Sequence, residues 1–313
     1  MINQIEKIII YLYPLIISLG IIGNAFSFLI FSRKQFKKTI FQVYFRLVSI
    51  SNTLAVIIPV NYFLMYQFNY DISKLSSFTC KLMDYLIYTS CPISSYILAY
   101  ASIDRMLHMV SPFKYQFRNK IKFQLFICIL VIFITMIYYV PILVFRKLEP
   151  IIGINQSDEI KQYVCVYTDG GFIYWMDLFY STIIPFVIMF ISTSITVFVL
   201  FKSKKKTNGI NSRDIKYAIT SISLNICFFV FVFPLTVFLL LSLYLNIDEK
   251  VYELTFIILL CIYSINYANM FYVNMFTNSI FRNEFLKMLI KNLRKIGVNL
   301  NVKVKSSTIS TIN

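Results

Sequence analysis

The sequence predicts an all-α fold, a bundle of seven helices that cross a membrane. Hydrophobic side chains make up 58% of the 313 residues and the mean hydropathy is +0.71, which is above the usual balance of a water-soluble domain. Seven apolar runs each exceed the roughly 20 residues that a helix needs to cross the hydrocarbon core. None of the runs alternates apolar and polar residues as a barrel strand does. We therefore expect each run to form a helix, in which its backbone N–H and C=O groups are hydrogen-bonded within the run.

The seven runs follow one another with short polar connections, at residues 8–31, 40–66, 82–109, 122–145, 172–201, 217–245 and 252–276. We therefore expect a short extracellular tail over 1–7 and one seven-helix domain over 8–276. Over 277–296, apolar residues recur at helical spacing against basic ones, which predicts an amphipathic helix on the inner membrane surface. The polar segment 297–313 is predicted to be a disordered cytoplasmic tail.

Basic residues concentrate on one side of the predicted membrane. If residue 1 lies outside, the cytoplasmic segments hold 23 of the 30 Lys and Arg residues but 3 of the 14 Asp and Glu residues. Because cytoplasmic loops carry such an excess, we expect a plasma-membrane protein with an extracellular N-terminus. The charge lies beside the membrane spans, so we expect anionic membrane lipid and an acidic cytoplasmic protein as partners, and not nucleic acid.

Two further markers agree with this orientation. Four of the six cysteines lie within apolar runs, whereas Cys80 and Cys165 lie at the predicted outer face. We expect a disulfide between these two, which would tie the third run to the second outer loop. The sequon Asn155-Gln-Ser157 falls in the same loop, so Asn155 is a predicted glycosylation site.

Residues suited to catalysis are missing from the sequence. The chain has one histidine, and it lacks a Gly-rich phosphate loop, an HExxH motif, a CxxC pair and a GxSxG motif. Neither metal-dependent hydrolysis nor acid–base catalysis has the residues that it needs. We therefore expect no enzyme activity, no cofactor and no metal site.

The order and spacing of several residues resemble the rhodopsin-like (class A) G-protein-coupled receptors over residues 8–290. In that family a Cys opens the third helix and an Asp-Arg-Tyr motif closes it, and here Cys80 and Asp104-Arg105-Met106 occupy those places. The 25 residues from Cys80 to Arg105 span about 37 Å of helix, which is enough to cross the membrane. Pro112 matches the family's second inner loop.

Other landmarks of the family occur in the expected order. They are the helix-one Gly23-Asn24, the helix-five Pro185, the helix-six Phe228 and Pro234, and in helix seven and the segment after it Asn266 and Phe281-Arg282. Several landmarks differ. Asn52 replaces the helix-two Asp, Val232 the helix-six Trp and Thr193 the inner Tyr of helix five. The helix-seven Asn-Pro-x-x-Tyr becomes Met270-Phe271-Tyr272-Val273-Asn274, and helix four has no Trp.

The family's helix-two Asp holds a sodium ion, together with polar neighbours that match Ser94 and Asn266. A neutral Asn52 lacks the carboxylate that would offset the dehydration of the ion. We therefore expect no sodium sensitivity.

The resemblance implies that Arg105 lies at the end that couples to a heterotrimeric G protein. Counting back 20 residues from Pro234 reaches Asp214, where the family often carries an acid that bridges to this Arg. We expect Arg105 to pair with Asp104 and Asp214 at rest, and an outward movement of helix six to free it for the G protein. The dipeptide alone fits a simpler interpretation, a helix end whose Arg reaches lipid phosphates.

The ligand site is expected in the outer half of the bundle. Ser264 stands where an opsin has its lysine, and Ile87 where a monoamine receptor has an Asp, so neither class is favoured. The remaining outer side chains are acidic or aromatic: Asp84, Tyr88, Tyr174, Asp177, Tyr244, Tyr252, Glu253 and Tyr263. They suit a cationic, aromatic-rich ligand such as a short amidated neuropeptide, although interfacial tyrosine belts and solvated acids account for part of the set. The segment NMFYVNMFTNSIFR also resembles FMRFamide-type receptors.

Two alternatives to a signalling receptor remain open. A decoy or scaffold receptor that reaches the cell surface without coupling is consistent with the missing Trp and Tyr. A seven-helix transporter would need inverted repeats, broken Gly- and Pro-rich helices and paired charges at mid-membrane. The chain has 7 Gly, which disfavours this second alternative.

Overall fold

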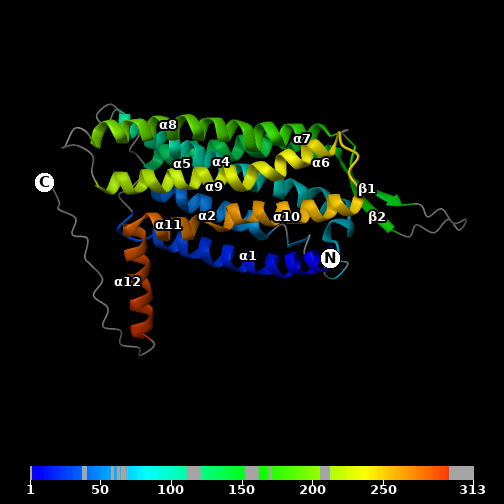
Figure 1. The fold of residues 1–313 in the computed structure, drawn as a ribbon, viewed down its shortest axis with the longest axis horizontal. Coiled ribbons are helices and arrows are strands. Elements are labelled where there is room, and N and C mark those ends of the chain that lie inside the picture. The colour runs from blue at the N-terminus through cyan, green and yellow to red at the C-terminus, as the bar shows by residue number, and fades with distance from the viewer. Residues whose placement is uncertain are drawn as a thin grey trace, which may run out of the picture.

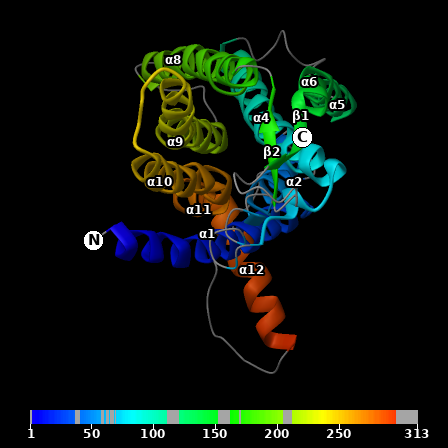
Figure 2. The same ribbon diagram turned by 90° about the vertical axis from the view of Figure 1, so that its right-hand side faces the viewer.

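The structure is a computed structural model that describes residues 2–36, 41–57, 60–61, 64, 68, 70–110, 121–151, 162–168, 171–204 and 212–295. Long helices lie side by side in one elongated bundle, seen from the side in Figure 1 and from one end in Figure 2. Within this part of the chain, six helical spans are long and apolar enough to cross a membrane. The predicted all-α bundle is confirmed.

The spans of the bundle follow one another in the predicted order. They are α1 (Ile2–Phe31), α2 (Phe41–Ile57), α4 (Ser77–Val110), α5 (Ile121–Tyr138) with α6 (Val140–Phe145), α7 (Phe172–Asp177) with the π-helical turn η3 (Leu178–Ile183) and α8 (Ile184–Lys204), α9 (Ser212–Ser242), and α10 (Glu249–Ala268) with α11 (Met270–Thr277). The described part of α2 has 17 residues and is the shortest of these spans.

One helix differs from its predicted bounds. Residues 2–7 were expected to form an extracellular tail, but α1 begins at Ile2 and includes them. Ile2 and Ile5 continue the spacing of the apolar residues that follow, so the helical pattern extends through this stretch.

The bundle packs aromatic and aliphatic side chains inside and leaves apolar side chains outside. Tyr44, Phe228 and Phe281 are fully or almost fully buried, whereas Phe133 on α5 is 60% exposed and Phe198 on α8 is 66% exposed. Large exposed apolar faces are costly in water, but they match the lipid around a membrane protein.

The two ends of the bundle carry different structures. At one end, called here the hairpin end, strands β1 (Arg146–Ile151) and β2 (Gln162–Tyr167) form an antiparallel pair in the stretch that was predicted only as a loop. The 3₁₀ turn η1 (Ile72–Lys74) contacts β2 there.

At the other end, called here the α12 end, α12 (Ser279–Lys295) lies across the axis of the bundle (Figures 1 and 2). Its Phe281 ring packs 5.1 Å from that of Phe31 and 5.8 Å from that of Phe271, measured between centroids. Glu284 forms ion pairs with Arg33 at 2.9 Å and with Lys287 at 2.8 Å. The helix occupies the stretch predicted as amphipathic, whereas the predicted tail 297–313 lies outside the described residues.

Candidate functional site

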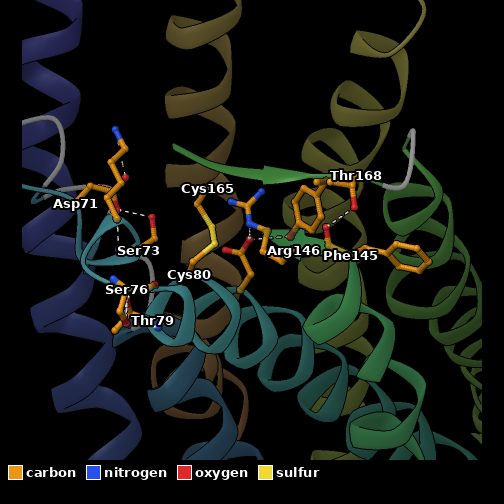
Figure 3. The surroundings of a disulfide bond; sticks show 12 residues. Asp71, Ser73, Ser76, Thr79, Cys80, Phe145, Arg146, Cys165 and Thr168 are labelled. Atoms are coloured by element: carbon orange, nitrogen blue, oxygen red, sulfur yellow. Dashed lines mark hydrogen bonds and ion pairs between the residues drawn. A yellow bond between two sulfur atoms is a disulfide. The ribbon is translucent and has the colours of Figure 1, made fainter. Parts of the chain in front are cut away.

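A disulfide joins α4 to the β-hairpin. Cys80, in the first turn of α4, is bonded to Cys165 of β2 with their Cα atoms 5.8 Å apart (Figure 3), which confirms the predicted pairing. Cys80 is fully buried. The bond closes a sequence separation of 85 residues, and it therefore fixes the hairpin over one end of the bundle.

A second contact between the same two elements lies one helical turn along α4. Cys80 and Asp84 are four residues apart and share one face of the helix. Cys165 and Tyr167 are two residues apart and share one face of β2, and Tyr167 pairs with Arg146 of β1 in the hairpin register. The helix face therefore meets the strand face at two places, first through the disulfide and then through Asp84.

The contact at Asp84 is an ion pair with Arg146. Arg146 Nε lies 2.6 Å from Asp84 Oδ2, and the Tyr167 hydroxyl donates a hydrogen bond of 2.8 Å to the same oxygen. The guanidinium carbon of Arg146 lies 4.0 Å from the centroid of the Tyr167 ring. Burial raises the pKa of Tyr167 well above its ordinary value, so the hydroxyl keeps its proton and remains a donor. The charge of Asp84 is thus compensated within the protein, and Figure 3 shows Arg146 beside the disulfide.

A cavity of about 430 Å³ opens beneath the hairpin, between α4, α7, α9 and α10. All six residues of the predicted ligand pocket line it: Asp84, Ile87, Tyr88, Tyr174, Asp177 and Tyr263. Arg146, Tyr167, Glu249, Tyr252 and Glu253 also contribute to the wall. The volume lies within the range typical of small-ligand pockets, and the wall combines aromatic rings with a few polar groups.

The charges that face this cavity are mostly negative. Among the described residues, four carboxylates line the cavity, those of Asp84, Asp177, Glu249 and Glu253, together with one base, Arg146. Because Arg146 is paired with Asp84, the other three carboxylates have no base opposite them among the described lining residues. Asp177 accepts a hydrogen bond of 2.8 Å from the Tyr139 hydroxyl, which orients its carboxylate at the end of α7.

The predicted switch residues lie deeper in the bundle. Ser94 Oγ donates to Asn52 Oδ1 at 2.5 Å, and Asn24 Nδ2 donates to the carbonyl of Tyr267 at 3.0 Å. Asn266 is buried on α10. The described residues contain no group of three His, Cys, Asp or Glu side chains that could hold a metal ion.

The three predicted proline and phenylalanine landmarks lie in α8 and α9. Pro185 is the second residue of α8, just after the π-helical turn η3, and the changed hydrogen-bond pattern of such a turn suits a residue that has no N–H to donate. Pro234 lies inside α9, and Phe228 of the same helix is 1% exposed. Pro234 directly precedes Leu235 and Thr236, which line the cavity.

Arg105 lies inside the bundle near the α12 end. Its side chain is 1% exposed, and its guanidinium carbon lies 5.5 Å from the centroid of the Tyr217 ring on α9. This burial contradicts the simpler interpretation of an Arg that reaches lipid phosphates. Asp104 accepts a hydrogen bond of 3.2 Å from Gln124 Nε2, and Gln124 in turn accepts one from the Tyr44 hydroxyl.

Three predicted site residues cannot be placed in this site. Pro112 and Asn155 lie outside the described residues, and the side chain of Asp214, on the first turn of α9, does as well. The proposed bridge from Arg105 to Asp214 and the glycosylation of Asn155 therefore stay predictions.

The chain is similar in sequence to known proteins over most of its length. The family model described as the 7 transmembrane receptor (rhodopsin family) matches residues 23–269. The chain is similar to cysteinyl leukotriene receptor 1 from Homo sapiens, Mus musculus and Cavia porcellus, with identities of 24%, 24% and 25% over 208 residues. Each match covers 63% of this chain, and the chain spans 58%, 56% and 58% of the length of those relatives.

Proposed function

The chain belongs to the rhodopsin family of seven-transmembrane receptors, and from that premise we propose that it binds an extracellular ligand and activates a heterotrimeric G protein. Such a chain is a multi-pass membrane receptor and not an enzyme. We assign the ligand to the cavity at the hairpin end and the G protein to the α12 end. The two sites lie at opposite ends of the bundle, as transmission of a signal across a membrane requires.

The proposed orientation places the hairpin end outside the cell and the α12 end in the cytoplasm. The disulfide at the hairpin end supports this orientation, because such bonds persist in oxidising compartments. The α12 end carries the basic residues, including Arg33, Lys287 and Lys291, that are typical of cytoplasmic membrane surfaces. In this orientation the sequon at Asn155, which stands between β1 and β2 in the sequence, would belong to an extracellular segment.

The proposed ligand is cationic and aromatic, such as a short amidated neuropeptide. The observation that carries this proposal is the charge of the cavity, where Asp177, Glu249 and Glu253 face no base among the described lining residues. A cationic group would gain attraction from these carboxylates, and the rings of Tyr88 and Tyr263 offer cation–π contacts. Amidation removes the negative C-terminus of a peptide and so avoids repulsion within this cavity.

Asp84 has a different part in this proposal. Its carboxylate already binds Arg146 and Tyr167, so it holds the hairpin in place at the rim of the cavity. We assign recognition of the ligand's positive charge to Asp177 and to the two glutamates on α10.

A G-protein activation assay in cells tests this function. The receptor is exposed to amidated peptides that contain Arg and aromatic residues, to the same peptides as free acids, and to cysteinyl leukotrienes. We expect an amidated peptide to act at a concentration at least about tenfold below that of its free-acid form. We expect Asp177→Asn to weaken this response and Arg105→Ala to abolish it at equal surface expression.

Other results would favour other functions. A response to leukotrienes alone would overturn the assignment of a cationic ligand. A receptor that reaches the surface and stays silent with every G protein would favour the decoy alternative, and a ligand response that survives Arg105→Ala would exclude coupling through this residue.

A further inference from the structure

Four hydrogen-bonding side chains from three helices meet one turn away from Arg105. Asn225 on α9 donates from Nδ2 to Ser102 Oγ on α4 at 3.0 Å and to Thr193 Oγ1 on α8 at 2.7 Å. Ser221 Oγ, one turn from Asn225 on α9, lies 3.2 Å from Ser102 Oγ. We call Ser102, Thr193, Ser221 and Asn225 the Asn225 cluster.

The Asn225 cluster is closely packed within the bundle. Asn225 is 8% exposed and Ser102 is 3% exposed. The crevice between Ser102, Thr193, Ser221 and Arg105 leaves no volume that a water molecule could occupy. If α9 moved away from α4 and α8, Asn225 would lose both acceptors, and buried polar groups left without partners are costly.

The Asn225 cluster lies close to Arg105, the residue to which we assign G-protein coupling. Ser102 precedes Arg105 by three residues on α4, so both side chains face α9 from the same side of the helix. Tyr217, whose ring faces the Arg105 guanidinium, lies on α9 as well, two turns from Asn225. A shift of α9 would therefore break the cluster and change the surroundings of Arg105 in a single movement.

Another neutral contact fastens the same part of α9. Thr220 Oγ1 lies 2.8 Å from Thr277 Oγ1 on α11. Together with the Asn225 cluster, this contact joins α9 to α4, α8 and α11 through hydroxyl and amide groups. The hydrogen bonds that Thr220, Ser221 and Asn225 make to other helices join uncharged side chains.

We propose that Asn225 is a positioning residue that holds α9 closed against α4 and α8, so that breaking its hydrogen bonds is a step in receptor activation. The signalling consequence rests on the proposed function, whereas the closed position of α9 does not. Because its members are uncharged, this latch is insensitive to ionic strength, unlike a bridge between Arg105 and Asp214 near the membrane surface.

The position of α9 can be measured without a ligand or a G protein. The full-length receptor is purified in lipid nanodiscs, with Cys227→Ser to remove the partly exposed cysteine of α9 and Lys216→Cys to attach an environment-sensitive fluorophore near the α12 end. We expect Asn225→Leu, which keeps the shape but loses the amide, to raise the open fraction about tenfold. Thr193→Val should change the fluorescence of the label in the same direction. The variant that combines Thr193→Val with Asn225→Leu should differ little in fluorescence from Asn225→Leu alone.

A matched control separates the latch from a general loss of packing. Leu224 precedes Asn225 and is 3% exposed, so Leu224→Ala removes core contacts of α9 without removing a hydrogen bond. We expect it to lower the melting temperature while leaving the label where it is in the parent protein. If the fluorescence of the label were unchanged in Asn225→Leu, or if Leu224→Ala changed it equally, the proposed role of Asn225 would be overturned.

The same samples distinguish failure of the latch from failure of the proposed function. A shifted label in Asn225→Leu without nucleotide exchange on any G protein would support the latch and overturn the proposed coupling. An unshifted label in a receptor that activates a G protein in response to ligand would overturn the latch and leave the proposed function in place.

Discussion

Arg146→Ala is expected to loosen the hairpin that covers the cavity. The substitution leaves Asp84 buried with the Tyr167 hydroxyl in place of an ion pair, and the two side chains of the pair are 15% and 11% exposed. Removing one partner of a buried pair costs about 3 kcal/mol at the lower end of the usual range. At roughly 2 °C per kcal/mol for a chain of this size, the melting temperature should fall by about 6 °C.

Thermal unfolding of the purified receptor in nanodiscs measures this effect. Lys147→Ala is the matched control, because Lys147 is exposed on the neighbouring position of β1 and points to the opposite face of the strand. Replacing both charges, as in Asp84→Leu with Arg146→Met, should recover most of the loss because no buried charge is left alone. Equal melting temperatures for Arg146→Ala and Lys147→Ala would refute the reasoning.

Three further substitutions test other parts of the structure. Cys165→Ser should destabilise the receptor by about 4.5 kcal/mol through loss of an 85-residue cross-link, seen as reduced surface expression. Asn52→Asp should make the melting temperature depend on Na⁺ through a carboxylate beside Ser94, whereas the parent protein should be unaffected when Na⁺ replaces K⁺. Glu284→Gln should weaken docking of α12 at Arg33 by about 1 kcal/mol, seen as faster hydrogen exchange in α12 with no change in α4.

The bundle and much of the candidate cavity can be predicted from the sequence because they depend on local patterns. Apolar runs of membrane-spanning length define the helices, and helical spacing then places Asp84 and Tyr88 on one face of α4. The disulfide follows from the position of Cys80 and Cys165 at the same predicted membrane face. Each of these inferences needs only the order of residues and the thickness of a bilayer.

The pairings across the bundle cannot be obtained in that way. Arg146 reaches Asp84 because the hairpin register sets it opposite Tyr167, and no pattern within 146–171 specifies that register. Asn225 and Ser102 are 123 residues apart and meet only once α9 has packed on α4. The beginning of α1 differs for another reason, because a minimum span for a membrane helix sets no upper limit on its length.

Ligand-free nucleotide exchange by the reconstituted receptor tests the central claim most directly. The parent protein, Asn225→Leu, and Asn225→Leu combined with Arg105→Ala are compared in nanodiscs with a panel of heterotrimeric G proteins. If breaking the Asn225 cluster opens a coupling site built around Arg105, Asn225→Leu raises the exchange rate of one G protein about tenfold and the combined variant returns it to that of the G protein alone. An exchange rate in Asn225→Leu that is no higher than in the parent protein, or that survives the loss of Arg105, would contradict the account.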